Sequence, residues 1–156
     1  LNDHPDFVMK WRCTQPVSLY PQTRPLASLA AGVQWLLTRR GICASNHFDA
    51  VACLRSSDEL AYPDLQFTLS PIAMDGLSFE PLAEHAFQMH VGLMRAHSRG
   101  RLELRSADPT APPRILCNYL QDERDRVAMR RGVRMLRDLV QQPAFASLCG
   151  AELFPG

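Results

Sequence analysis

The chain has no two glycines spaced as G-x-G, although eight glycines occur among its 156 residues. The tight turn that holds a dinucleotide pyrophosphate after a strand needs that spacing, and a P-loop needs a comparable glycine-rich turn. The sequence therefore excludes both kinds of nucleotide site within this chain. It also lacks a G-x-S-x-G nucleophile elbow, an H-E-x-x-H helix and the cysteine pattern of zinc deaminases.

Cysteines are few and scattered. The five cysteines are odd in number, and no two of them form a C-x-x-C pair. Neither a disulfide framework nor a zinc site is therefore expected, and the histidines show no metal-ligand spacing either. We interpret the cysteines as reduced structural residues of a cytosolic protein.

Long apolar runs and a strong charge of either sign are also missing. The net charge is +1, which gives no reason to expect a nucleic acid or an anionic membrane as partner. No apolar run approaches the length that spans a bilayer, so we expect no transmembrane segment. The chain shows no signal peptide and opens on Leu1 without an initiator Met, which we interpret as a piece cut from a longer protein. The expected location is the cytoplasm, with peripheral contact to the inner membrane left open for the intact protein.

What the chain does have is an alternation of apolar and polar residues with the period of a β-strand. Residues 7–13, 65–70 and 87–93 alternate in this way, 102–104 continues the pattern, and 48–54 is mostly apolar. This alternation predicts an antiparallel sheet with one apolar and one polar face.

Two helical patterns interrupt the strands. One covers residues 26–40, and the other begins near Asp122, a suitable N-cap, and ends before Pro143. The order of strands and helices favours one α+β domain over residues 1–156, with a largely antiparallel sheet and both helices packed on its apolar face.

The polar sheet face suits either solvent or the wall of a pocket. It would carry Gln66, Thr68, Ser70, Gln88 and His90. Antiparallel sheets commonly have one wet face, so a solvated surface is the first interpretation and a pocket wall the second.

The most polar cluster in an apolar setting is residues 45–50. On an extended strand His47 and Asp49 would share a face, roughly 7 Å apart along the chain. Such a pair suits a cationic group beside a hydroxyl. A purely structural His–Asp pair at a strand start is the commoner arrangement, and spacing alone favours it.

The second helix carries arginines on its outer face, at positions 124, 130, 131, 134 and 137. Basic side chains on one helix can contact phosphates. Acidic residues are interspersed here and aromatic residues are missing from that face, so we interpret it as solvated rather than as a nucleic-acid site.

Several longer motifs resemble a known family. The stretches 98–109, 113–115 and 118–120 resemble the start of the C-terminal segment of the glucose-methanol-choline (GMC) flavoprotein oxidoreductases. Residues 15–20, 44–48, 55–56, 84–92, 94–95 and 142–144 are similar to the choline dehydrogenase subgroup, and residues 1–5 resemble a segment of the wider family. The resemblance covers essentially the whole chain.

The resemblance implies the substrate-binding domain of an FAD-dependent alcohol dehydrogenase, which oxidises a primary alcohol by hydride transfer to flavin. In that family the FAD-binding glycines would precede Leu1, and the catalytic histidine would follow Gly156. FAD is therefore expected in the intact protein and not on this chain, no catalytic residue is assigned here, and the isolated chain is expected to be inactive. The expected partners are an alcohol substrate and the protein's own FAD-binding domain.

The resemblance also suggests substrate contacts. Choline-acting relatives place a histidine where His47 stands and a glutamate where Asp49 stands, and we hypothesise that both face the substrate together with Arg95. Asp49 is one methylene shorter than glutamate, which puts choline itself in doubt. The alternative is a non-catalytic α+β binding module. An excised domain would also expose the face that normally packs on the FAD domain, so self-association through an apolar patch is expected.

Overall fold

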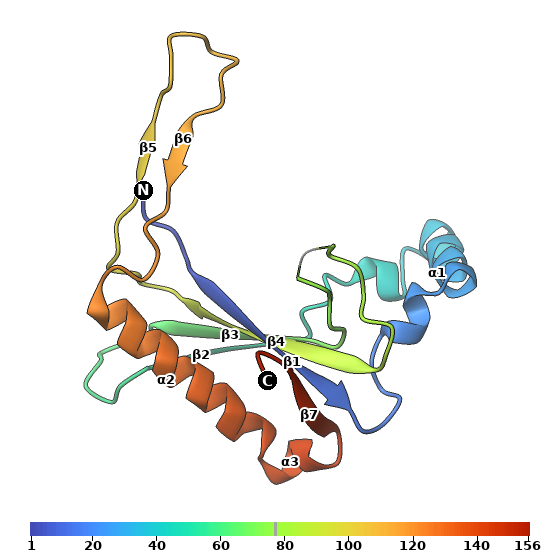
Figure 1. Ribbon diagram of the computed structural model, residues 1–156. Coiled ribbons are helices and arrows are strands. Elements are labelled where there is room, and N and C mark those ends of the chain that lie inside the picture. The colour runs from blue at the N-terminus through green and yellow to red at the C-terminus, as the bar shows by residue number, and fades with distance from the viewer. Residues whose placement is uncertain (77) are drawn as a thin grey trace.

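The computed structural model describes residues 1–76 and 78–156 and has a five-stranded sheet with a separate hairpin (Figure 1). The strand order is β2-β3-β4-β1-β7, and every neighbouring pair is antiparallel. The elements are β1 (Asp6–Cys13), α1 (Pro25–Thr38), β2 (Ala50–Leu54), β3 (Leu65–Ser70), β4 (Ala86–Leu93), β5 (Arg101–Glu103), β6 (Arg114–Leu116), α2 (Glu123–Val140), α3 (Pro143–Ala146) and β7 (Cys149–Phe154), with short 3-10 helices η1 (Tyr20–Thr23) and η2 (Ile42–Ala44). The predicted α+β class with a largely antiparallel sheet is confirmed.

One face of the sheet forms the core. Met9 of β1 lies opposite Met89 of β4, and Phe67 of β3 lies opposite Val91. The buried apolar residues of this face are Met9, Trp11, Leu65, Phe67, Phe87, Met89, Val91 and Leu93. Each such side chain contributes about 1.5–3 kcal/mol when it is removed from water, so this face dominates the stability of the fold.

Helix α2 covers the apolar face. Asp122 caps it, because its side chain accepts a hydrogen bond from the backbone N–H of Arg124. Leu136 is fully buried against the sheet. Gly132 allows a close approach, since a Cβ atom built there would lie 2.6 Å from Cγ2 of Val91. The predicted start of this helix and its apolar stripe are confirmed.

The outer arginines of α2 are largely ion-paired. Arg126 and Arg130 both contact Glu123, and Arg137 contacts Glu152 of β7. The Arg137 guanidinium holds the pKa of the Glu152 carboxyl below its usual value, although partial burial acts in the opposite direction. Glu152 thereby ties the last strand to the helix that covers the sheet.

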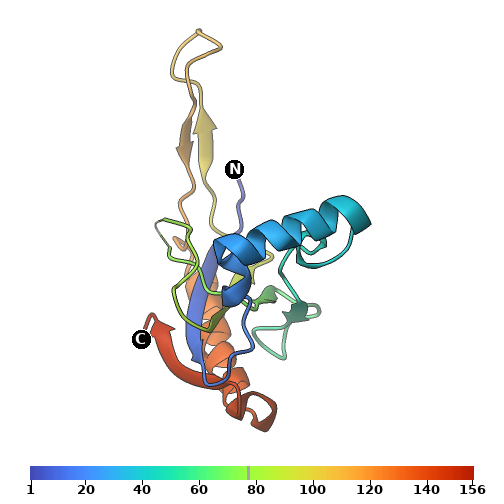
Figure 2. The ribbon, with the colours of Figure 1, turned by 90° about the vertical axis from the view of Figure 1, so that its right-hand side faces the viewer.

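Helix α1 does not pack on the sheet. Its contacts are chiefly with η1 and η2, and Figure 2 shows it projecting away from the strands. Leu26, Leu36 and Leu37 are 82%, 63% and 80% exposed. The expectation that both helices cover the apolar sheet face is therefore wrong for α1. An apolar stripe on a helix indicates that the helix packs on another surface, but the stripe does not identify that surface.

The hairpin formed by β5 and β6 projects from the body (Figure 1). Leu102 pairs with Ile115 across it, and these side chains are 60% and 57% exposed. Neither strand joins the main sheet. An isolated two-stranded sheet is only marginally stable in water, so the attachment of the hairpin to the body matters.

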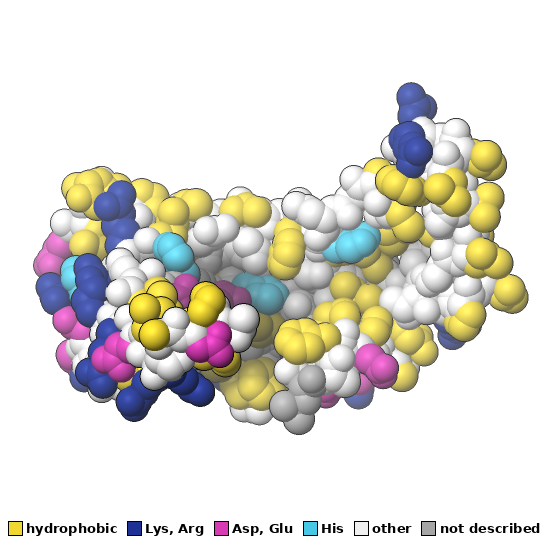
Figure 3. Space-filling view, turned by 90° about the horizontal axis from the view of Figure 1, so that it is seen from above, with side chains coloured by type: hydrophobic (Ala, Val, Ile, Leu, Met, Phe, Trp, Pro, Cys, Tyr) yellow, Lys and Arg dark blue, Asp and Glu magenta, His cyan; other side chains and the backbone are white. Residues whose placement is uncertain are grey.

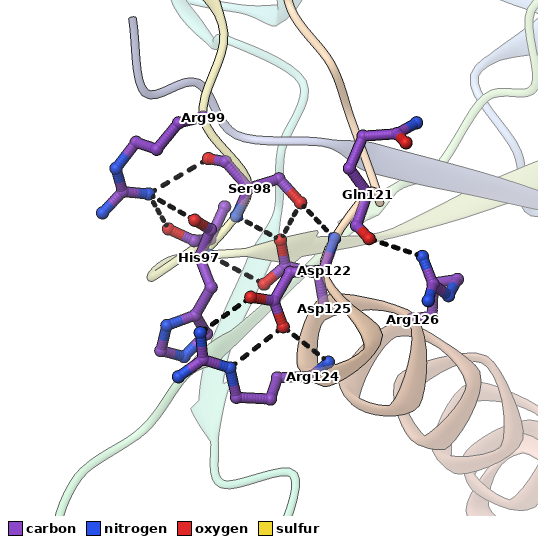
Figure 4. Close-up of polar contacts among 9 residues, drawn as sticks. His97, Ser98, Arg99, Gln121, Asp122, Arg124, Asp125 and Arg126 are labelled. Carbon is purple, nitrogen blue, oxygen red and sulfur yellow. Dashed lines mark hydrogen bonds and ion pairs between the residues drawn. The ribbon is translucent and has the colours of Figure 1, made fainter.

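A buried carboxylate makes that attachment (Figure 4). Asp125 of α2 is 2% exposed and accepts hydrogen bonds from the backbone N–H groups of His97 and Ser98, at 2.8 and 2.7 Å. The Ser98 hydroxyl donates to it at 2.5 Å and accepts from the backbone N–H of Asp122 at 3.0 Å. Burial raises the pKa of Asp125, but these hydrogen bonds outweigh burial and the net pKa is lowered.

Candidate functional site

The polar face of the sheet carries a cavity of about 430 Å³. Seen from above, this side of the molecule is hollowed, and histidine and acidic side chains are visible within the hollow (Figure 3). The residues that line the cavity are His4, Asp6, Asn46, Phe48, Val51, Gln66, Thr68, His90, Gly92, Leu93 and Met94. Its volume lies within the range of small-molecule sites.

A carboxylate and a histidine lie side by side in this cavity. Nδ1 of His90 on β4 is 2.6 Å from Oδ2 of Asp6 on β1. The His90 side chain is 17% exposed and the Asp6 side chain 46% exposed. Val8 lies directly opposite His90, and Asp6, two residues before Val8 on the same face of β1, lies opposite Gly92. Asp6 and His90 therefore occupy adjacent strands and share one face of the sheet. The pair therefore stands diagonally across the β1–β4 ladder.

Further polar groups continue from His90 into the protein. Nε2 of Gln88 lies 2.9 Å from Nε2 of His90, and Oε1 of Gln88 accepts a hydrogen bond of 2.9 Å from the backbone N–H of Met74. Gln88 is 8% exposed. A continuous hydrogen-bonded chain thus runs from the partly buried backbone amide of Met74 to the carboxylate in the cavity.

One side of the cavity is apolar. Phe48 contacts His90 edge-on, with ring centroids 5.7 Å apart and planes at 78°. Val51, Leu93 and Met94 complete this apolar side. A carboxylate beside an aromatic ring and aliphatic groups suits a small organic cation, because the ring and the carboxylate both attract positive charge and the apolar walls accept its methyl groups.

The predicted polar face is thus the wall of a pocket. Gln66, Thr68 and His90 line the cavity, and Ser70 and Gln88 are 5% and 8% exposed. The second interpretation, a pocket wall, describes Gln66, Thr68 and His90, and Gln66 is at the same time exposed to solvent. The segment before β2 and the ends of β1 and β4 enclose this face. The alternation of residues within a single strand does not predict how these segments are placed.

His47 and Asp49 do not lie on an extended strand. His47 has a φ of 62°, in the left-handed region, and β2 begins only at Ala50. The side chains of Ser45 and Asn46 accept hydrogen bonds from the backbone N–H groups two residues further on, which turns the chain here. The expected alternation of side chains therefore fails at this point.

The cavity lies next to these residues without including them. Asn46 and Phe48 line it, whereas His47 and Asp49 are not among its lining residues. Asp49 is exposed. Nδ1 of His47 is buried and has no hydrogen-bond partner among the residues that the structure describes. A contact of either residue with substrate stays a prediction.

Arg95 lies in a second cavity of about 900 Å³, between the β2–β3 connection and the start of α2. Its guanidinium sits 4.2 Å from the centre of the Tyr62 ring. Leu93 and Met94 line both cavities, so the two adjoin. The three predicted site residues are thus not gathered in one pocket, and the role of Arg95 also stays a prediction.

Asp6 is the site residue that sequence reasoning missed. Asp6 directly follows residues 1–5, which carry part of the family resemblance, but the resemblance assigns no role to it. Its importance comes from the pairing of β1 with β4, which brings it to His90 across 84 positions of sequence. No periodicity within one strand reveals that pairing.

The described residues form no site of a known kind for a metal ion or a dinucleotide. Among residues 1–76 and 78–156, no three His, Cys, Asp or Glu side chains are arranged to bind a metal ion. The cavity described above has no glycine-rich turn at a helix start, so its residues do not fit the pyrophosphate of a dinucleotide. None of the described helices combines the length and apolar character that a membrane crossing requires.

Comparison with known proteins gives consistent results. Residues 96–156 match the family described as GMC oxidoreductase. The chain is 44% identical over all 156 residues to an oxygen-dependent choline dehydrogenase of Ectopseudomonas mendocina, and 41% identical to that of Pseudomonas syringae pv. syringae; it covers 28% of each. It thus spans little more than a quarter of the length of these curated relatives.

Solved structures show the same fold in longer chains. A formate oxidase superposes with a TM-score of 0.84 at 23% identity, over 99% of this chain and 32% of its own. Pyridoxine 4-oxidase from Mesorbium loti gives 0.70 at 19% identity, over 98% of this chain and 27% of its own. The solved structures show a shared fold. The family match over residues 96–156 and the identity to relatives along the entire sequence show that this chain is similar to the GMC oxidoreductases.

Proposed function

We propose that this chain is the substrate-binding domain of an FAD-dependent alcohol dehydrogenase that oxidises a primary alcohol carrying a cationic group. The observation that carries the proposal is the Asp6 carboxylate, hydrogen-bonded to His90 in a cavity that also has an apolar side formed by Phe48, Val51, Leu93 and Met94. The name of the relatives, oxygen-dependent choline dehydrogenase, agrees with a small organic cation as substrate.

In this proposal the chain binds and orients the alcohol. Asp6 attracts the cationic group, and Phe48 with Met94 shields it from water. FAD, bound by a part of the protein outside this chain, supplies the hydride acceptor. The residues described here take no part in that chemistry beyond placing the substrate.

The remaining partners and the location are proposals of the same kind. The polar face would be closed by the protein's own FAD-binding domain, and residues 1–156 would form one substrate-binding unit. The exposed leucines of α1 support an apolar contact with another surface, either within the intact protein or between copies of the isolated chain. We propose a cytoplasmic location for the intact enzyme, with peripheral contact to the inner membrane as the alternative.

The test uses the full-length flavoprotein. Its flavin absorbance is followed anaerobically while choline, neutral primary alcohols and other cationic alcohols are added. Bleaching by a cationic alcohol supports the proposal. Absence of bleaching by every alcohol contradicts it and favours the non-catalytic binding module.

Two matched variants locate the cation site. Asp6→Ala should raise KM for the cationic alcohol at least tenfold and leave neutral alcohols little changed, because a charged hydrogen-bonding partner contributes about 1.5–3 kcal/mol. Asp49→Ala removes the same group from a neighbouring exposed position. An equal or larger effect at Asp49 would move the cation site to the predicted pair of His47 and Asp49.

A further inference from the structure

We propose that Gln88 and His90 are positioning residues, which fix Asp6 so that one of its carboxylate oxygens stays available to the substrate cation. The inference rests on the proposed function of the cavity. It assigns a role to the hydrogen-bonded chain behind the carboxylate rather than to the carboxylate itself.

The first step fixes the Gln88 amide. The backbone N–H of Met74 can only donate, and it lies 2.9 Å from Oε1 of Gln88. The carbonyl side of the amide therefore faces Met74, and the NH₂ group faces His90. Because Gln88 is 8% exposed, water competes poorly for either group.

The second step fixes the histidine tautomer. A side-chain NH₂ group donates and does not accept, so Nε2 of His90 must accept the 2.9 Å hydrogen bond from Gln88. The proton of the neutral imidazole then lies on Nδ1. From there it is donated to Oδ2 of Asp6 at 2.6 Å.

The third step concerns the other oxygen of Asp6. Oδ1 has no hydrogen-bond partner among the residues that the structure describes, while Oδ2 is held by His90. Opposite Asp6 stands Gly92, and a Cβ atom built there would lie 3.4 Å from Oδ1. The glycine thus keeps open the space beside the unpaired oxygen, on the wall of the cavity.

All three side chains stand on paired strands rather than on loops. Gln88 and His90 belong to β4, and Asp6 begins β1. A carboxylate held by a charge-assisted hydrogen bond on such a frame keeps its orientation before the ligand arrives. Without His90, Asp6 is free to rotate, and binding must then restrict it.

The experiment measures binding of the tetramethylammonium ion to the full-length flavoprotein by calorimetry, so it does not depend on turnover. His90→Gln places its amide near the Nε2 position and should weaken binding about tenfold, the loss of one hydrogen bond to a charged group. His90→Asn places an NH₂ group near the Nδ1 position and should restore binding to within about threefold of the unaltered protein. His85→Asn, a change at a histidine that bonds Ser18 instead, serves as the control.

Nitrogen NMR of the His90 ring gives a second, independent reading. We expect Nδ1 to be protonated in the unaltered protein. Gln88→Glu replaces the donor by a carboxylate, so it should put a proton on Nε2. Protonation at Nε2 in the unaltered protein, or His90→Gln binding as tightly as His90→Asn, overturns the proposal. If the unaltered protein fails to bind the ion, the proposed function fails, and the ring protonation still decides whether the chain of hydrogen bonds exists.

Discussion

Asp125 and Ser98 share a hydrogen bond of 2.5 Å between a carboxylate that is 2% exposed and a buried hydroxyl. The same carboxylate binds two successive backbone N–H groups, at His97 and Ser98. One side chain of α2 therefore fixes the path by which the chain enters the β5–β6 hairpin.

Replacing Asp125 by Ala should destabilise the domain by about 3 kcal/mol, because two buried N–H groups and a hydroxyl lose their acceptor. Urea unfolding followed by circular dichroism measures the change. Ser98→Ala removes one donor and leaves the carboxylate with its two backbone partners, so it should cost about 1 kcal/mol. A smaller loss for Asp125→Ala than for Ser98→Ala would contradict the central role of the carboxylate.

The pH dependence of stability should reflect the lowered pKa of Asp125. A carboxyl whose pKa is lower in the folded state stabilises the fold fully above its unfolded value of about 3.9. That contribution is lost as pH falls through the folded pKa. Urea midpoints measured from pH 6 downwards should therefore drop more steeply below about pH 4 for the unaltered protein than for Asp125→Asn. Parallel curves would show that Asp125 does not contribute.

Two glycines within helices provide a matched pair. Gly132→Ala in α2 should cost about 1–3 kcal/mol, because the new methyl group would meet Val91 at 2.6 Å and push the helix from the sheet. A Cβ atom built at Gly32 of α1 meets no other heavy atom within 4 Å. Gly32→Ala should therefore stabilise the protein by about 0.5–1 kcal/mol through its higher helix propensity. Thermal unfolding of both variants tests the opposite signs.

The exposed leucines of α1 should drive self-association of the isolated chain. Leu36→Glu and Leu37→Glu together should lower the weight-average mass at high concentration, because they place charge on a surface that is 63% and 80% exposed at these positions. Light scattering measures the mass. Leu139→Glu on α2, at a position 39% exposed, is the control and should leave association unchanged.

The hairpin should become ordered by the rest of the protein. Leu102 and Ile115 form an uncovered pair, so backbone amides of residues 101–103 and 114–116 should exchange rapidly in this chain alone. In the full-length protein the same amides should exchange at least tenfold more slowly if the proposed FAD-binding domain covers them. Equal rates in both proteins would show that this hairpin is not a domain contact.

Much of the sheet could be predicted from the sequence because alternation decides which face a side chain occupies. This alternation places Met9, Phe67 and Met89 on one face of the sheet. The start of α2 could be predicted separately, from the N-cap residue Asp122. Strand β7 was not predicted, since the sequence from Cys149 to Phe154 does not alternate cleanly.

The candidate site was harder to predict because it depends on contacts between distant segments. Asp6 meets His90 only through the pairing of β1 with β4. His47 takes a left-handed backbone conformation that residue type alone does not require. The polar residues of β3 and β4 were identified, but the carboxylate that gives the cavity its charge comes from another strand.

The sheet order has a consequence for synthesis. Strand β1 lies between β4 and β7, so the first strand of this sequence receives its second neighbour from the last strand of this sequence. A ribosome must therefore deliver residues 149–154 before the edge of β1 beside Trp11 is covered. Until then this edge is open to a strand from another nascent chain, and translation that pauses in α2 would prolong the risk of such intermolecular pairing.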